Sequence, residues 1–258
     1  MTGIEALAKE YSAYVDTFRG PDGRLPKMME LKLVHTEKVV EAAKAIAEGE
    51  GFDGRLAVAC EAAALLHDTG RYEQLRRYDT FKDSESVDHA VFSYEIVREK
   101  GWLEGWPDKD AILTAVLVHN RRELPLAEMD AFTVKCAKNT RDADKLDIFR
   151  VLEEQVRNCD WRHDSRAFWN LPTTAAPNPA VVKAILESRP VDYQNIRSLA
   201  DFVLIQVGWM ASGLEYATSR RICRARNHLA FRREFLRRLS DDRAIDDVCD
   251  FASARLMR

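Results

Sequence analysis

Histidine and aspartate side chains at recurring positions are the residues of this 258-residue chain with the clearest capacity for chemistry. The central pair is His67-Asp68, which follows an apolar run and precedes Gly70 and Arg71. Such a pair alone is a weak signal, because adjacent titratable residues often cap a helix or form a surface hydrogen bond. Four more residues of these types lie in apolar amphipathic stretches, where an unpaired polar group is costly to bury. They are His35, His89, His119 and Asp144.

A shared metal site explains this set better than independent core residues do. For a single inward-facing histidine, a hydrogen-bonded core position is favoured by about three to one. Four histidines and two aspartates on separate helices would instead leave many desolvated polar groups to satisfy one by one. Imidazole and carboxylate ligands suit iron, manganese, zinc, cobalt or nickel, and six ligands fit two ions that share a carboxylate. The remaining histidines, His163 and His228, lie among charged residues and are predicted to be on the surface.

The elements that position these residues are predicted to be helices, because nearly every segment has a helical period and strand-like alternation is scarce. His35 falls on the same apolar stripe as Val39, Ala42 and Ile46, so it is expected to face inward. A polar connection is expected at 71–86 and a proline-rich loop or lid at 171–179. Asn178 and Pro179 are expected to cap and begin a helix, which three further helical stretches follow. The other predicted helices cover about 4–18, 27–47, 54–66, 87–100, 107–120, 131–138 and 142–158.

Composition favours an ordinary globular protein in a reducing compartment. The net charge is -3, which gives no reason to expect a stable nucleic-acid partner. The five cysteines show no C-x-x-C spacing, which argues against a thiolate zinc site or a disulfide framework. The N-terminal stretch lacks the features of a signal peptide, and the apolar run 202–214 is too short to cross a bilayer. We therefore expect a cytoplasmic protein that does not enter a membrane.

The ordered set of residues resembles a known family. His35, His67-Asp68 and Asp144, with Ala143-Asp144-Lys145-Leu146 as the final motif, resemble the HD superfamily of metal-dependent phosphohydrolases. The added His89 and His119 resemble its dinuclear branch, which contains cyclic-dinucleotide phosphodiesterases and a few mixed-valent diiron oxygenases. The resemblance spans about residues 28–149. It implies an all-α HD-domain helical bundle with a C-terminal helical extension, in one domain over 1–258 with a metal-binding core at about 27–158 and an extension at about 159–258.

The resemblance also implies a ligand set and a reaction. His35, His67, Asp68 and Asp144 would hold a first divalent transition-metal ion, and Asp68 would bridge to a second ion held by His89 and His119. Iron or manganese is favoured for both ions over cobalt, nickel or zinc. A water or hydroxide between the ions would attack a phosphate ester, such as a nucleotide. The alternatives are a diiron oxygenase that acts on a phosphonate or polyol, and a metal-binding sensor without turnover.

Cationic residues near the ligands are candidates for contact with a small phosphorylated substrate. Arg71 and Lys145 are predicted to be catalytic and to bind this substrate, and Arg121 to bind it, because cations neutralise phosphate oxygens and the charge developing in phosphoryl transfer. Arg122 is expected to be a solvated helix end, and the arginines at 220–226, 232, 233, 237 and 238 a solvated helix face. Asp142 and Asp147 compete with Asp144 as ligands, but are expected to be a helix N-terminal charge and a surface carboxylate.

Two signals limit the substrate prediction. A Gly-Tyr-Pro signature and a doubled histidine at the fifth ligand are typical of the cyclic-di-GMP branch, and this chain reads His119-Asn120-Arg121 instead.

The tryptophans Trp161, Trp169 and Trp209 are expected to pack the C-terminal extension, with one of them available to line a pocket. Neither the substrate nor the oligomeric state follows from these residues.

Overall fold

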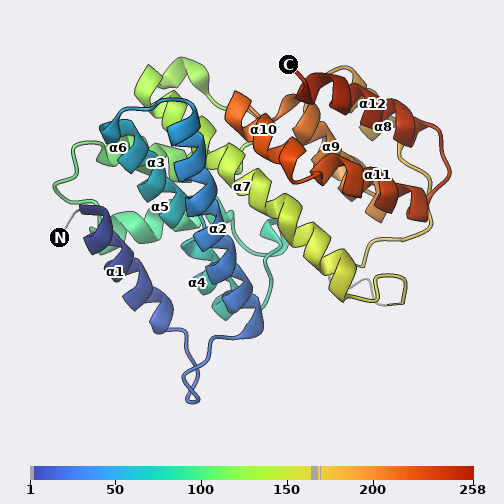
Figure 1. Cartoon of the computed structure of the whole chain (residues 1–258). Coiled ribbons are helices and arrows are strands. Elements are labelled where there is room, and N and C mark those ends of the chain that lie inside the picture. The colour runs from blue at the N-terminus through green and yellow to red at the C-terminus, as the bar shows by residue number, and fades with distance from the viewer. Residues whose placement is uncertain (1–2, 164–167, 169) are drawn as a thin grey trace. The chain divides into compact units, whose positions relative to one another are not determined.

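The computed structural model describes residues 3–163, 168 and 170–258, and every regular element in that part of the chain is a helix (Figure 1). The predicted all-α fold is therefore confirmed. Two compact units divide the chain, Met1–Asp147 and Ile148–Arg258. The boundary falls inside a long helix, α7 (Ala131–Asn158). Each unit has its own apolar core.

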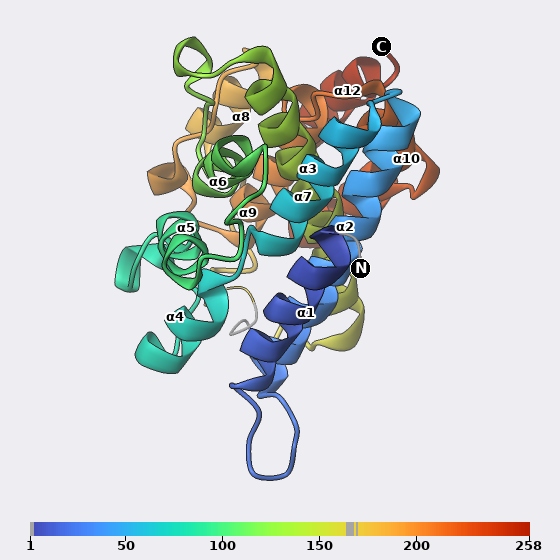
Figure 2. The same cartoon turned by 90° about the vertical axis from the view of Figure 1, so that its left-hand side faces the viewer.

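The first unit is a bundle built around α3, whose buried residues cover most of its circumference. Figure 2 shows α2 and α3 side by side, and α3 also packs against α1 and α6. Helix α5 packs against α4 and α6, and α4 packs against α2. Two short 3-10 turns, η1 (Asp83–Glu85) and η2 (Leu126–Glu128), lie in the connections. Before α7, the helices of this unit are α1 (Gly3–Asp16), α2 (Lys27–Gly49), α3 (Gly54–Leu66), α4 (Gly70–Tyr78), α5 (His89–Lys100) and α6 (Lys109–Val118).

Short polar side chains set the beginnings of the helices that carry site residues. The Asp53 carboxylate accepts a hydrogen bond from the backbone N–H of Leu56 and caps α3. The Asp88 carboxylate accepts from the N–H groups of Ala90 and Val91 and caps α5. Each cap satisfies amide donors that the first turn of a helix leaves without partners. His89 is therefore held as the first residue of α5.

The prediction of a polar connection at 71–86 is wrong for its first part, because helix α4 occupies Gly70–Tyr78. Although this helix is polar in composition, it has a packed face on which Tyr72, Glu73 and Gln74 are buried. Gly70 begins α4 and lets this helix approach α5. A Cβ atom at this position would lie 2.7 Å from the backbone nitrogen of Ser93.

The predicted break between 138 and 142 is also wrong, because α7 runs without interruption from Ala131 to Asn158. The segment contains no glycine or proline to end a helix. Its polar residues find partners without leaving the helix. The Asn139 amide donates to the Ala43 carbonyl, and the Thr140 hydroxyl donates to the Cys136 carbonyl one turn back.

The second unit is arranged around α9, which packs against α8, α11 and α12. Asn178 caps α8 as predicted, by accepting from the N–H of Ala180, and Pro179 is the first helical residue. Four helices follow α8 instead of three, because the chain leaves helical geometry at Gly213, Asn227 and Ser240. The helices are α8 (Pro179–Leu186), α9 (Leu199–Ser212), α10 (Ala217–Ala225), α11 (His228–Leu239) and α12 (Ala244–Leu256), with the 3-10 turn η4 (Tyr193–Asn195) before α9.

Two predicted surface residues of the second unit are buried instead. Arg232 is fully buried, and His228 is 2% exposed. The Glu153 carboxylate accepts hydrogen bonds from both of them, at 2.9 Å from Arg232 and 2.5 Å from His228 Nδ1. The Gln206 amide oxygen and the Phe149 carbonyl also accept from Arg232. Partners from α7 and α9 therefore compensate the buried charge of Arg232, which the local sequence had placed on a solvated helix face.

The histidine and tryptophan residues that the sequence singled out in this unit have different outcomes. His163 is exposed as predicted. Trp161 packs edge-on against Phe235, and Trp209 packs against Phe149. Trp169 lies outside the described residues. None of the described helices combines the length and the apolar composition that crossing a bilayer requires.

Candidate metal centre

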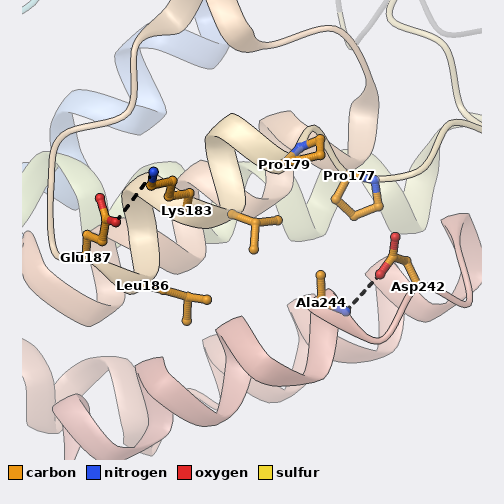
Figure 3. A pocket seen from close by; sticks show the side chains of 8 residues that line it. Pro177, Pro179, Lys183, Leu186, Glu187, Asp242 and Ala244 are labelled. Carbon is orange, nitrogen blue, oxygen red and sulfur yellow. Dashed lines mark hydrogen bonds and ion pairs between the residues drawn. The ribbon is translucent and has the colours of Figure 1, made fainter.

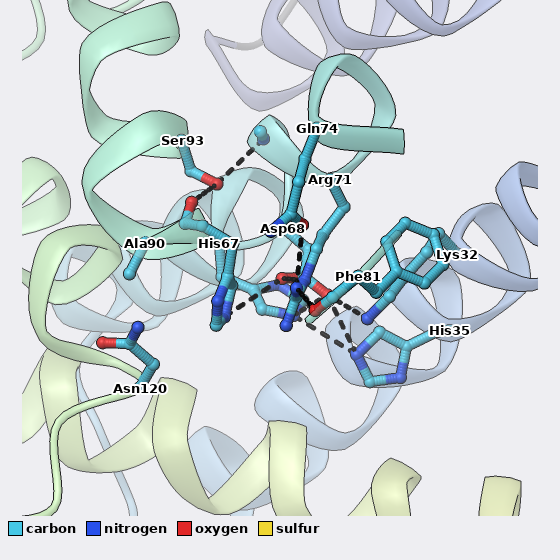
Figure 4. Close-up of polar contacts among 12 residues, drawn as sticks. Lys32, His35, His67, Asp68, Arg71, Gln74, Phe81, Ala90, Ser93 and Asn120 are labelled. Carbon is cyan, nitrogen blue, oxygen red and sulfur yellow. Dashed lines mark hydrogen bonds and ion pairs between the residues drawn. The ribbon is translucent and has the colours of Figure 1, made fainter. Parts of the chain in front are cut away.

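The six predicted ligands meet in the first unit at the ends or middles of four helices and one turn. His67 and Asp68 form the turn between α3 and α4, and both are buried. His35 lies in the middle of α2, beside this turn, and Asp144 lies in α7. His89 begins α5, and His119 follows the last residue of α6. Figure 4 shows Asp68 at the centre, with His35 directed toward it from α2.

One half of the cluster is formed by His35, His67 and Asp144. The Nε2 atoms of His35 and His67 are 3.3 Å apart. An Asp144 carboxylate oxygen lies 3.2 Å from His35 Nε2 and 3.8 Å from His67 Nε2. The spacing of these three ligand atoms is compatible with one metal ion between them.

The other half is formed by His89 and His119, whose Nε2 atoms are 3.1 Å apart. One oxygen of Asp68, Oδ1, lies 3.7 Å from His89 Nε2 and 3.8 Å from His119 Nε2. The other oxygen, Oδ2, lies 3.6 Å from His35 Nε2 and 3.5 Å from His67 Nε2. The two oxygens of Asp68 therefore face different histidine pairs, which is the geometry that a carboxylate shared between two ions needs.

The tautomers of two histidines follow from their partners. His67 Nδ1 lies 2.7 Å from the Ala64 carbonyl, and His119 Nδ1 lies 2.7 Å from the Val116 carbonyl. A carbonyl can only accept, so both Nδ1 atoms must carry the proton. In the neutral ring, Nε2 then presents a lone pair to the centre of the cluster.

Carboxylates orient the other two histidines in the same way. His35 Nδ1 lies 2.7 Å from Asp147, and His89 Nδ1 lies 2.5 Å from Asp83. A carboxylate on one ring nitrogen fixes the orientation of the imidazole and raises the basicity of the other nitrogen. All four Nε2 atoms thus point inward as candidate ligand atoms.

Electrostatics separates the two halves of the cluster. Burial lowers the pKa of His119 to about 3 and also lowers the pKa of His89, so both rings are neutral at pH 7. Burial alone would raise the pKa of Asp68, but Lys32 and His67 contribute to holding it well below its usual range. Asp68 Oδ1 is buried without a hydrogen-bond partner among the described residues. Two lone pairs and an anionic oxygen therefore face one another without a proton, and a cation is the group that they fit.

The pKa of His35 is shifted in the opposite direction to those of His89 and His119. Burial and the Lys32 charge lower its pKa, but hydrogen bonds with Asp144 and Asp147 outweigh them and raise it. The two carboxylates that face this ring, Asp144 and Asp147, are thus the cause of its raised pKa. Metal binding at this half requires the loss of the Nε2 proton.

Two cations lie beside Asp68. Lys32 Nζ is 2.6 Å from Asp68 Oδ2, and Arg71 Nε is 3.5 Å from Asp68 Oδ1. The Arg71 guanidinium also donates to Gln74, the Phe81 carbonyl and the Asp83 carboxylate. Arg71 therefore lies beside the cluster, while its role in substrate binding stays a prediction.

The other predicted substrate-binding cations are placed differently. Lys145 Nζ lies 4.0 Å from Asp142, three residues earlier on α7. Arg121 is exposed, and its backbone carbonyl accepts a hydrogen bond from Arg141.

Three site residues did not follow from the sequence as site residues. They are Asp147, Lys32 and Asp83. Asp147 is buried, which corrects its expected role as a surface carboxylate, and Asp142 is buried inside α7 instead of lying at a helix N-terminus. Asp147 follows Asp144 by three residues and Lys32 precedes His35 by three, so helical spacing was the available signal for both. Asp83 lies in a connection, where no periodicity identifies it.

A shallow groove lies in the second unit, with a volume of about 380 Å³ (Figure 3). Two prolines and α8 line one side, and Asp242 and Ala244 line the other. The Lys183–Glu187 pair lies at its edge. Its described lining residues include no histidine or cysteine, so the His/Asp cluster is the candidate functional site.

Comparison with known proteins agrees with the geometry. The family model of the HD domain matches residues 33–148, a range that contains all six predicted ligands together with Asp83 and Asp147. Searches of curated proteins and of solved structures found no match. HD domains bind divalent metals and form a family of metal-dependent phosphohydrolases, and His/Asp groups of this chain are spaced to hold a metal. Residues 33–148 of the chain are therefore an HD domain.

Proposed function

We propose that the chain is a phosphohydrolase that cleaves a nucleotide or another small phosphate ester with two divalent transition-metal ions. His35, His67 and Asp144 would hold one ion, His89 and His119 the other, and Asp68 both. The observation that carries the proposal is the division of Asp68, whose two oxygens face different histidine pairs. When bound, such ions polarise a phosphoryl oxygen and lower the pKa of a coordinated water.

The chain's own residues have separate roles in this proposal. Asp147 and Asp83 orient His35 and His89 through their Nδ1 atoms. Arg71 is held by Asp83 and by the Phe81 carbonyl, so its guanidinium is positioned before a substrate arrives. A guanidinium in this place suits a phosphoryl oxygen, because charge-assisted hydrogen bonds to phosphate are strong. The roles of Lys145 and Arg121 in substrate binding stay as predictions.

The test combines metal analysis with a substrate screen. The protein is purified both anaerobically and in air, its metal content is measured, and phosphate release is followed with a panel of nucleotides and phosphate esters. Release that depends on manganese, iron, cobalt or nickel, without oxygen uptake, is the expected result. Oxygen-dependent consumption of a phosphonate or polyol, with a mixed-valent iron signal, would show that the chain is an oxygenase instead.

Variants test the two-ion arrangement separately from turnover. Asp68→Ala is expected to remove both ions, and His89→Ala to remove one while the fold is kept. His163→Ala is the matched control, because His163 is exposed and lies outside the first unit. A full metal complement in Asp68→Ala would refute the bridging role, and unchanged turnover in His89→Ala would reduce the site to a single ion.

A further inference from the structure

Lys32 lies closer to the centre of the cluster than any of the cations that the sequence suggested. Its ammonium is 2.6 Å from Asp68 Oδ2, and its side chain is 15% exposed. It sits one helical turn before His35 on α2, so both side chains reach the cluster from the same face (Figure 4). Among the described residues, Asp68 is its hydrogen-bond partner.

Lys32 and Arg71 border the same aromatic ring. The Lys32 ammonium and the Arg71 guanidinium each lie 5.6 Å from the centre of the Phe81 ring, and Figure 4 shows all three beside Asp68. Both cations are largely shielded from water, with side chains 15% and 14% exposed. A partly desolvated pair of cations attracts an anion more strongly than the same pair would in open solvent.

The two cations differ in what else holds them. Arg71 donates to Gln74, the Phe81 carbonyl and Asp83, so its position does not depend on Asp68. The ammonium of Lys32 depends on Asp68 Oδ2, the oxygen that faces His35 and His67. A metal ion between those histidines would compete with the ammonium for this oxygen. Lysine has the flexible stem that such a change of partner requires.

We propose that Lys32 is an exchangeable cation of this site: it neutralises Asp68 in the metal-free protein and binds an oxyanion of the substrate, next to Arg71, once metal is bound. The inference rests on the proposed function, because it assigns Lys32 a substrate contact within that site. The ligand chemistry is a tetrahedral oxyanion, which a phosphate ester and a phosphonate share. Metal and substrate binding are then linked, since the ion that displaces Lys32 from Asp68 frees the ammonium for the anion.

The proposal predicts opposite effects on metal and anion binding. Removal of the Lys32 charge removes a competitor for Asp68, so metal affinity is unchanged or higher. The same change removes a charge-assisted contact with the oxyanion, so anion affinity falls by about ten-fold or more. If Lys32 only held the Asp68 carboxylate in its orientation, removal of the Lys32 charge would lower metal affinity instead.

The experiment compares Lys32→Met with Lys38→Met in the full-length protein. Lys38 lies on the same helix but is exposed and pairs with Glu41. Calorimetry measures first the binding of Mn²⁺, and then the binding of methyl phosphate and of methylphosphonate to the Mn²⁺-loaded protein. Circular dichroism checks folding, and Lys32→Gln, which can still donate to Asp68 without a charge, replaces a variant that does not fold.

The expected result is that the Lys32 variant keeps or gains Mn²⁺ affinity and loses affinity for the anions, while Lys38→Met matches the wild type. A loss with one probe alone supports the proposal and assigns the oxyanion to that source. Unchanged anion affinity, or a fall in Mn²⁺ affinity of ten-fold or more, would overturn the inference while the proposed function stands. Wild-type protein that binds no Mn²⁺ or other divalent transition metal would refute both.

Discussion

Gly70 is the position at which a single methyl group should disturb the candidate metal centre most cleanly. It is buried at the start of α4, where this helix meets α5. A Cβ atom there would lie 2.7 Å from the Ser93 nitrogen and 3.0 Å from the His89 carbonyl oxygen. Both neighbours are backbone atoms, so no side-chain rotation relieves the contact. Reaching an ordinary contact of 3.4 Å requires a displacement of about 0.7 Å between the helices.

The cost of Gly70→Ala follows from this displacement. Overpacking of this kind destabilises a protein by about 1–3 kcal/mol, and the better helix propensity of alanine offsets at most about 1 kcal/mol. A net loss of about 2 kcal/mol would lower the melting temperature of a unit of this size by about 4–8 °C. Because His89 begins α5, its displacement should also weaken metal binding by about ten-fold.

Gly54→Ala provides the matched control for this prediction. Gly54 also begins a helix, α3, but no atom lies within 4 Å of its added Cβ. Its variant should stay within about 0.5 kcal/mol of the wild type. Thermal and urea unfolding, with Mn²⁺ titration, compare the two variants. If Gly70→Ala unfolds at the same temperature as Gly54→Ala and binds metal equally well, the close contact between α4 and α5 does not position His89.

Further predictions concern the carboxylates that hold buried cations and rings. Asp147→Asn should weaken metal binding by about 10- to 100-fold with little change in fold, because the carboxylate on His35 Nδ1 is lost; unchanged Mn²⁺ affinity in calorimetry would contradict this. Arg232→Met should destabilise the second unit by about 3–5 kcal/mol, because Glu153 stays buried without its buried guanidinium partner at 2.9 Å and keeps the exposed Arg157 guanidinium at 3.6 Å; urea unfolding would contradict it if Glu153→Gln did not partly restore stability in the double variant. Burial raises the pKa of Glu153, but hydrogen bonds from His228 and Arg232 outweigh it and hold this pKa below the ordinary value. The contribution of Glu153 is thus fully present above about pH 4.5 and is lost as the pH falls through the lowered pKa; stability measured against Glu153→Gln should show this difference shrinking in acid.

The candidate ligands could be predicted from the sequence because each lies in or next to an apolar stretch. His35 shares a stripe with aliphatic residues, and His67-Asp68 follows the apolar helix α3. Polar residues on apolar faces are conspicuous, and their order along the chain resembled a family. The match of the HD domain to residues 33–148 confirms that resemblance. The two-ion arrangement and the roles of the individual residues stay as proposals.

The predictions that were wrong concern polar residues that have other polar residues as neighbours in the sequence. The segment that became α4 reads as a connection, although Tyr72 and Gln74 are buried on one of its faces. Arg232 lies in a run of arginines, and Asp147 in a run of charges, yet each is buried against a partner more than 70 positions away in the sequence. Burial of a charged group depends on that distant partner, so a local pattern cannot show it.

Helical period and residue type were therefore enough to predict an all-α fold and to select six candidate ligands. Contacts between helices decided the rest. Only the folded chain turns the two oxygens of Asp68 toward different histidine pairs, assigns Asp147 and Asp83 to the outer nitrogens of His35 and His89, and brings Lys32 against Asp68. The physical reason is that periodicity reports which face of a helix is buried, whereas charge compensation depends on which faces meet.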